Sequence, residues 1–274
     1  SVELLKLIDP PLYYGKFIAQ GVFPDGRAID AFKCFSFKRG VAGGSTAGSA
    51  LLRQGGVTVV CTVDASLSPL STAASLEIAF VDDAAVEKNS LMDARAVVEE
   101  LAQRGSLFKR DAVLSSNSRL EWKLKATIRF LHADGDVATA VVGALLAALS
   151  DTKLPTVKLS HADDDEAPIV PVEIEIDRDE STWKQLQLAS WPVSSTFLVY
   201  REECGKTHLL ADPPLDVRSL CEARCTIVVA GRDEKGRKEI IVMRSCGSIS
   251  DDLMGRIVDI AETRHTVISK ALQE

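Results

Sequence analysis

The sequence lacks the features of a membrane or secreted protein. No stretch approaches the roughly 20 uninterrupted apolar residues that a bilayer-spanning helix needs. The first residues, SVELLKLIDP, contain neither a basic segment nor the long apolar core of a secretory signal. We therefore expect a soluble, unsecreted protein with no membrane partner. Hydrophobic residues make up 46% of the 274 residues, which is enough for one large domain or two closely packed halves.

The cysteines lack the spacing of a metal site. No CxxC pair is present, histidines are not close by in sequence, and several cysteines lie inside apolar runs such as VTVVCTV. We interpret all six as reduced core thiols and expect no metal, cofactor or disulfide framework. They are Cys34, Cys61, Cys204, Cys221, Cys225 and Cys246.

Positive charge is also scarce. The chain has 32 lysines and arginines against 39 aspartates and glutamates, which gives a formal net charge of -7. A protein that grips nucleic acid over its whole surface is usually basic. This balance therefore argues against such a protein, but it allows a local basic track or an assembly that supplies positive charge elsewhere.

Hydrophobic periodicity predicts strands and helices in the first half. Residues 31–37 alternate apolar and polar side chains, and residues 57–63 are β-branched and almost wholly apolar. We predict two strands, the second buried on both faces. Residues 89–105 have helical spacing of apolar positions and end at a glycine, whereas residues 120–131 alternate as a strand with one buried face.

A tight turn at 133–136 leads into residues 137–149, which are apolar all round and predict a helix buried within the fold. Residues 151–171 are acidic and contain prolines, which favours an exposed connection. A metal-binding acidic loop is the alternative, but converging ligands are missing.

The second half repeats the pattern, which predicts an α+β protein with two pseudo-repeated β-α halves, about 20–151 and about 172–274. A final helix is predicted to begin after Ser250, as its N-cap, and to run through Leu272. The predicted strands of this half are 172–176, 194–200, 208–211, 225–230 and 239–243.

Several motifs, taken together and in order, resemble the RNase PH family. They are PDGR at 24–27, GSALLRQGGVTVVCTV at 48–63, HADGDVATAVVGALLAALSD at 132–151, and SSTFLVY, LLADPPLD and a terminal TRH in the second half. This resemblance covers nearly the whole chain. It implies an RNase PH-like fold in which both halves pack as one domain over residues 1–274.

Within that family, the DPP turn, the GSAL opening and the TRH motif are most similar to eukaryotic exosome ring subunits of the inactive class. The resemblance implies a non-catalytic subunit of a hetero-hexameric ring that processes and degrades RNA, including ribosomal RNA. Its expected partners are other RNase PH-like subunits, exosome cap proteins and single-stranded RNA in the assembled channel. We expect it in the nucleus and nucleolus, and also in the cytoplasm.

The family resemblance also indicates lost chemistry. Active relatives hold inorganic phosphate with a Gly-Thr-Arg sequence at the start of the buried helix, and those positions here are Asp136, Val137 and Ala138. The arginine is gone, and an aspartate stands where the anion would dock, close to Asp134. We expect Asp136 to cap the helix itself and to repel phosphate.

The two catalytic carboxylates of active relatives correspond here to Arg218 and Arg224. A register shift of two residues would place Asp216 and Glu222 there instead, also six residues apart, as a candidate metal pair. The chain would then be an active phosphorolytic or hydrolytic exoribonuclease. We favour the inactive interpretation, because a carboxylate pair without its phosphate cradle cannot perform phosphorolysis.

Basic residues supply candidate RNA contacts, and a module that binds RNA alone is a third hypothesis. Solvated surface or interface salt bridges are the alternative interpretation for each residue. The candidates are Lys38, Arg39, Arg104, Lys109 and Arg110, with Arg218 and Arg224 as a second group facing the vanished site.

Overall fold

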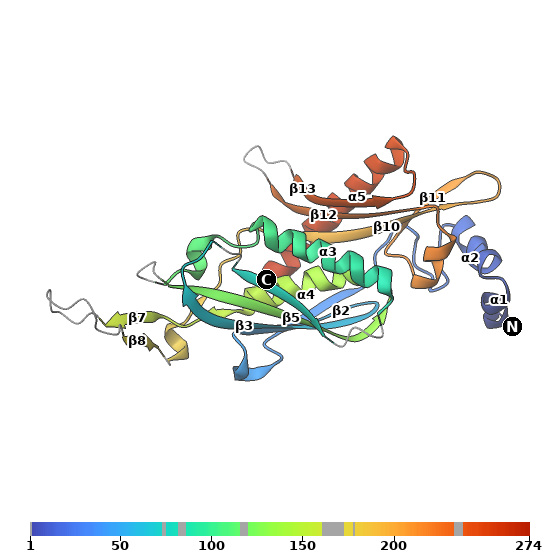
Figure 1. Cartoon of the computed structure of the whole chain (residues 1–274). Coiled ribbons are helices and arrows are strands. Elements are labelled where there is room, and N and C mark those ends of the chain that lie inside the picture. Colours follow the sequence, from blue (N-terminus) through green and yellow to red (C-terminus); the bar gives the residue numbers. More distant parts are fainter. Residues whose placement is uncertain are drawn as a thin grey trace.

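The computed structural model describes the chain except for residues 1, 73–74, 82–85, 116–119, 161–172, 178 and 233–237. Its main elements are a five-stranded sheet, a four-stranded sheet and five α-helices among the described residues (Figure 1). No helix in the described part of the chain is long and apolar enough to cross a membrane.

The first sheet has the strand order β1-β2-β3-β5-β4, and all its pairs are antiparallel except β4 with β5. The N-terminal helices α1 and α2 precede it, and α3 and α4 follow β4 and β5 in the chain. The elements are α1 (Val2–Ile8), α2 (Pro10–Ala19), β1 (Phe35–Arg39), β2 (Gly48–Gln54), β3 (Gly56–Pro69), β4 (Leu76–Val81), α3 (Lys88–Arg104), β5 (Leu120–Asp134) and α4 (Val137–Asp151).

The second sheet has the order β11-β10-β12-β13, and its pairs are all antiparallel. Two short pairs, β6 with β9 and β7 with β8, lie outside both sheets. The elements are β6 (Lys153–Leu154), β7 (Val157–Ser160), β8 (Glu173–Ile176), β9 (Lys184–Gln185), β10 (Val193–Arg201), β11 (Thr207–Ala211), β12 (Ala223–Arg232), β13 (Lys238–Cys246) and α5 (Asp251–Gln273).

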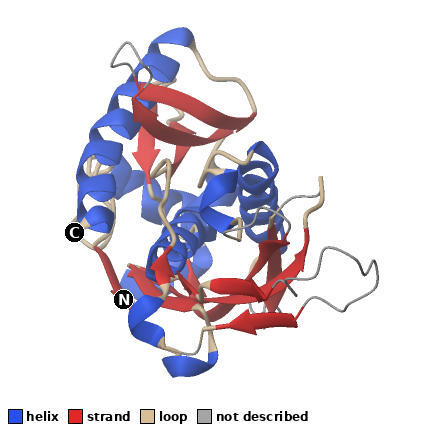
Figure 2. Cartoon of the chain, turned by 90° about the vertical axis from the view of Figure 1, so that its left-hand side faces the viewer, coloured by secondary structure: helices blue, strands red, loops and turns tan. Residues whose placement is uncertain are grey.

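These elements form four layers: the first sheet, α3 with α4, the second sheet, and α5 (Figures 1 and 2). Along β10, Leu198 faces the cluster that contains residues of α2, whereas Phe197 and Val199 pack against α5. This alternation is the period-2 geometry of a strand with helices on both faces of its sheet. This mixture of sheets and helices confirms the predicted α+β class.

The helix α4 lies between the two sheets, and every residue from Val137 to Ser150 is buried. A helix without a polar stripe can bury its whole circumference only in such a position. Gly143 permits the close approach to the first sheet, because a Cβ atom there would lie 2.6 Å from Leu52 Cδ1 and 3.2 Å from Phe35 Cε2. The predicted buried helix is thus confirmed.

The alternation predicted for β5 and the helices predicted at 89–105 and after Ser250 are also confirmed. The side chain of Ser250 accepts a hydrogen bond from Leu253 N at 3.4 Å. Gly105 ends α3 with a φ of 62°, which is the left-handed conformation that a glycine adopts without strain.

Several predictions need correction. The strand β3 is not buried on both faces, because Thr58, Val60 and Thr62 on its second face are only partly buried. Residues 31–34 are not in a strand, and β1 begins at Phe35. The expected acidic connection contains β6 and β7, while residues 161–171 lie outside the described residues.

The cysteines are not all core thiols. The side chains of Cys61 and Cys225 are buried, and Cys221 is partly buried, whereas Cys34, Cys204 and Cys246 are exposed. The helices α1 and α2 were not predicted either. Asp9 caps α2 by accepting a hydrogen bond from Leu12 N at 3.0 Å, and Pro10 occupies the first helical position, which is a usual start signal for a helix.

Candidate functional site

The candidate site begins where β5 ends and α4 starts. Gly135 turns the chain with a φ of 140°, and Asp136 precedes the first residue of α4. Val137 and Ala138 are apolar and fully buried. Of the three positions that correspond to the Gly-Thr-Arg sequence, only Asp136 therefore carries a charge.

Asp136 does not cap α4 with its side chain, which corrects our prediction. Its carboxylate instead accepts a hydrogen bond from Arg224 Nη2 at 3.0 Å and a weaker one from the Thr139 hydroxyl at 3.4 Å. Arg224 comes from β12 in the second sheet. The structure therefore joins the two halves of the predicted lost site through an ion pair.

Two acids of α3 and its N-cap complete the site. Arg218 donates hydrogen bonds to Glu87 Oε2 at 3.0 Å, Ser90 Oγ at 2.7 Å and Asp93 Oδ2 at 3.2 Å. Arg224 also forms an ion pair with Asp93. We name this group of five charged residues the arginine–carboxylate cluster: Glu87, Asp93, Asp136, Arg218 and Arg224.

The cluster holds three carboxylates against two guanidinium groups, and burial shifts the pKa of Asp136 and of Arg224. Burial raises the pKa of the Asp136 carboxyl, and the nearby carboxylate of Asp212 acts in the same direction. Burial lowers the pKa of Arg224, partly offset by the charge of Glu87. The carboxylates of the cluster therefore compensate the positive charges of Arg218 and Arg224 within the protein itself.

Little room remains beside Asp136, whereas a larger pocket of about 480 Å³ lies next to Asp93, Arg218 and Arg224. The cavity at the start of α4 has a volume of only about 20 Å³, which is about the space of one water molecule. Its lining includes Asp136, Thr196, Arg218 and Arg224. A tetrahedral phosphate ion does not fit into this smaller cavity unless the cluster opens.

Asp212 lies near Asp136 and forms polar contacts that the sequence did not indicate. The Asp212 carboxylate accepts hydrogen bonds from Gln54 Nε2 at 2.8 Å and from Lys33 N at 3.0 Å. Asp212 has a φ of 46°, and Arg27 donates to its carbonyl oxygen at 2.9 Å. Since Arg27 belongs to PDGR and Asp212 to the DPP turn, the two motifs bind each other and have a structural role here.

The alternative acidic pair does not converge. Asp216 accepts a hydrogen bond from the Tyr14 hydroxyl at 3.0 Å and forms an ion pair of 2.6 Å with Lys6. Glu222 instead accepts two hydrogen bonds from Arg201, at 2.7 and 2.8 Å. Among the described residues, no group of three or more histidine, cysteine, aspartate or glutamate side chains is placed to hold a metal ion.

The remaining basic candidates lie in three different places. Arg39 donates to Ser150 Oγ at 2.9 Å and stacks on Phe37, which ties β1 to the end of α4. Arg104 pairs with Glu100 one turn earlier in α3 at 2.8 Å. Lys38 and Lys109 are exposed and form no ion pair with a described residue.

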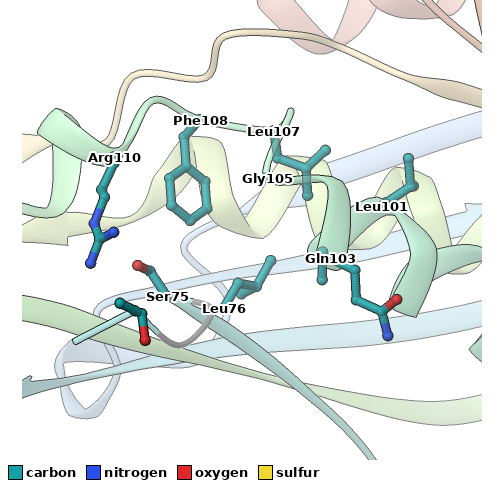
Figure 3. Close-up of a pocket in the computed structure, with 10 residues that line it drawn as sticks. Ser75, Leu76, Leu101, Gln103, Gly105, Leu107, Phe108 and Arg110 are labelled. Atoms are coloured by element: carbon teal, nitrogen blue, oxygen red, sulfur yellow. The ribbon is translucent and has the colours of Figure 1, made fainter.

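Arg110 lines a separate cavity of about 210 Å³ beside the end of α3, together with Phe108 and Leu76 (Figure 3). Its guanidinium pairs with Glu121 at 3.2 Å. Glu121 is fully buried and also pairs with Lys123 at 2.7 Å. The positive charge of Arg110 thus compensates the buried carboxylate of Glu121. Its RNA-binding role stays a prediction.

Comparisons with known proteins show what this fold and site resemble. Residues 31–155 match the family model RNase PH, described as "3' exoribonuclease family, domain 1". This range contains β1 to β5 and both helices of the central layer, and therefore includes Asp136 and its helix.

Solved structures extend the likeness to the whole chain. An archaeal exosome core chain is 19% identical with a TM-score of 0.72, and the match covers 100% of this chain and 99% of that one. A chain of the Archaeoglobus fulgidus exosome with RNA bound to the active site is 18% identical with a TM-score of 0.69 and 98% coverage of both chains. Rice Rrp46 is 14% identical with a TM-score of 0.59, covering 91% of this chain and 99% of that one. The fold is therefore RNase PH-like.

Proposed function

We propose that the chain is a non-catalytic structural subunit of an exosome ring. The single observation that carries the proposal is the ion pair between Asp136 and Arg224, which fills the position where active relatives would bind phosphate. The RNase PH match over residues 31–155 and the fold shared with exosome core chains support the ring assignment.

The physical argument concerns a phosphate ion brought to the start of α4. A like charge about 4 Å from Asp136 is repelled by about 1 kcal/mol in bulk water and by about 4 kcal/mol near a protein surface. The cationic side chain that would offset this repulsion is replaced by the methyl group of Ala138, and Arg224 is already paired. Without bound phosphate, phosphorolysis lacks its nucleophile.

The finer assignment is also our proposal. We place the chain among the inactive-class ring subunits of eukaryotes, most like ribosomal RNA-processing protein forty-three. It would occupy a hetero-hexameric ring with other RNase PH-like subunits, contact cap proteins and pass single-stranded RNA through the channel. Its place would then be the nucleus and nucleolus, and also the cytoplasm, where it serves ribosomal RNA processing and RNA degradation.

The decisive experiment incubates the purified chain with poly(A) RNA, with and without phosphate and magnesium. We expect no shortening of the RNA and no release of nucleoside diphosphates. An archaeal exosome core assayed in parallel serves as the positive control. Phosphate-dependent release by the pure chain would contradict the proposal. If activity were found, replacing Asp216 and Glu222 with alanine would decide whether that pair is responsible.

The ring assignment has its own test, which does not depend on catalysis. The native mass of the complex purified from its source should show one copy of this chain with other RNase PH-like subunits. A chain recovered alone, or as a stable homohexamer, would contradict the hetero-ring.

A further inference from the structure

The pocket of about 480 Å³ beside the arginine–carboxylate cluster lies at the edge of the second sheet. Its volume is within the range of protein binding sites. One wall belongs to α3, and the opposite wall belongs to the paired ends of β12 and β13. We call it the β13 pocket, and its lining includes Met92, Asp93, Arg218, Arg224, Arg244 and Cys246.

Arginines outnumber acids in the lining of this pocket. The charged members are three arginines, Arg218, Arg224 and Arg244, and two acids, Asp93 and Glu222. Both acids already have partners, because Asp93 pairs with Arg218 and Arg224 and Glu222 accepts two hydrogen bonds from Arg201. The other carboxylates of the cluster also pair with Arg218 or Arg224. A surplus of one positive charge therefore remains in the lining.

Arg244 carries this surplus charge. It is exposed, and its guanidinium has no hydrogen bond or ion pair with a described residue. Arg224 lies opposite Cys246 and Arg244 lies opposite Thr226 in the register of β12 with β13. The two arginines are therefore diagonal neighbours on one face of the sheet. Burial lowers the pKa of Arg224, and the positive charge of Arg244 acts in the same direction. A carboxylate between the two guanidinium groups relieves this repulsion.

The end of β13 beside the pocket is an uncovered sheet edge. β13 is the last strand of its sheet, and every residue from Met243 to Cys246 is exposed. Since successive side chains of a strand point to opposite faces, neither face is covered at this end. Residues 242–246 also pair with β12 without a bulge and contain no proline, two devices that protect edge strands. Such an edge can accept an extended segment through backbone hydrogen bonds.

The wall that faces β13 adds an apolar contact. Met92 of α3 lines the pocket and is 59% exposed. A methionine side chain adapts to the shape of an apolar group placed against it. The pocket therefore offers an unpaired cation, an open strand edge and an apolar contact within one space.

We propose that the β13 pocket receives an aspartate or glutamate side chain from an extended segment of a partner protein that lies along the edge of β13. The carboxylate pairs with Arg224 and Arg244, and a neighbouring apolar side chain covers Met92. The inference does not depend on the loss of catalysis.

This partner is a protein and not RNA. One carboxylate balances the single unpaired guanidinium, whereas each nucleotide of RNA brings a further negative charge toward Asp93 and Glu222. Among the described residues, no aromatic side chain lines the pocket on which a base could stack.

The test uses two synthetic ten-residue peptides and the full chain. One peptide has two glutamates among threonines and valines, and the other has glutamines in place of the glutamates. We expect the glutamate peptide to bind at least tenfold more tightly in fluorescence anisotropy. Arg244→Ala should weaken the binding of the glutamate peptide at least fivefold and leave that of the glutamine peptide unchanged.

Arg256→Ala is the matched control, because Arg256 is also exposed and unpaired among the described residues but lies on α5. It should change the affinity less than twofold, and circular dichroism should verify that both variants fold. Equal affinities of the two peptides, an Arg244→Ala variant that binds like the unchanged chain, or binding of neither peptide at millimolar concentration would overturn the proposal. So would tighter binding of a ten-nucleotide RNA that Arg244→Ala abolishes, because RNA would then be the occupant.

Discussion

At the scale of single residues, buried carboxylates form the main polar contacts of the candidate site. Asp136 is almost fully buried and faces an arginine from the other sheet. The Asp136 carboxylate thus gives Arg224 a negative partner within the chain, in the place of an anion bound from solution. The residue that we propose to exclude phosphate therefore also makes a contact between two layers of the fold.

The contribution of this contact can be measured with Asp136→Asn. The variant keeps the side chain's shape but removes the charge that Arg224 binds, although Arg224 retains Asp93. We expect the free energy of unfolding in urea to fall by about 2 kcal/mol, the range for a hydrogen bond to a charged group. Asp134→Asn, at an exposed position two residues earlier, should change it by less than about 0.5 kcal/mol. Equal effects of the two variants would refute the role of Asp136.

Glu121 predicts how stability depends on pH. Its hydrogen bond with Lys123, aided by Ser71 and Arg110 and opposed by burial, lowers the pKa of its carboxyl from 4.5 to about 2. A lowered carboxyl pKa stabilises the folded state above the unfolded value, and this stabilisation is lost as the pH falls from 4.5 toward 2. Glu121→Gln should therefore show a smaller loss of urea stability over this window than the unchanged chain. Glu77→Gln, at an exposed position, is the control and should lose as much stability over this window as the unchanged chain. If Glu121→Gln also loses as much as the unchanged chain, the prediction is wrong.

At the scale of elements, α4 is the centre of the fold because it contacts both sheets. An all-apolar helix has no preferred outer face, so the close approach of its neighbours decides its position. Gly143 is the point of that approach on the first sheet. At the start of α4, the ion pair between Asp136 and Arg224 joins this end of the helix to the second sheet.

A pair of glycine variants isolates this packing. Glycine-to-alanine in a helix interior gains about 1 kcal/mol from backbone propensity. Gly255 in α5 has no atom within 4 Å of the added Cβ, whereas the Cβ of Gly143→Ala would lie 2.6 Å from the fully buried Leu52. We expect Gly255→Ala to raise the free energy of unfolding. The free energy of unfolding of Gly143→Ala should be about 1–3 kcal/mol lower than that of Gly255→Ala because of overpacking. Thermal or urea unfolding measures both, and indistinguishable variants would disprove the tight contact.

At the scale of the whole molecule, the balance of charge restricts what the chain does alone. The formal net charge is -7, and five of the seven basic candidates for RNA contact already bind protein groups. A basic channel would have to be completed by neighbouring subunits. This agrees with a part of a ring better than with an independent RNA-binding module.

RNA binding by the isolated chain tests this conclusion. At 150 mM salt we expect fluorescence anisotropy with single-stranded RNA to give a Kd weaker than about 100 μM, the weak end of non-specific binding. Lys38→Ala with Lys109→Ala should leave this value unchanged, because two exposed lysines cannot offset the net negative charge. Micromolar binding that weakens steeply with salt would instead favour the independent module.

Local pattern was sufficient for most of the elements. The alternation of β5, the apolar circumference of α4 and the cap at Ser250 are properties of neighbouring residues, and each predicted its element correctly. The absence of an arginine at Ala138 is likewise visible in sequence alone. The pattern failed for β3, because an apolar strand looks the same whether one face or both are covered by other layers.

The sequence by itself determined α3, α4, α5, β5 and the four strands of the second sheet, together with the RNase PH resemblance and the aspartate at the start of α4. Only the tertiary structure decided that Arg224 neutralises this aspartate, that Arg218 binds Glu87, and that Arg27 holds the turn at Asp212. The physical reason is range. Helix and strand periodicity depends on residues a few positions apart, whereas these ion pairs and hydrogen bonds join side chains from layers that meet only after the chain has folded.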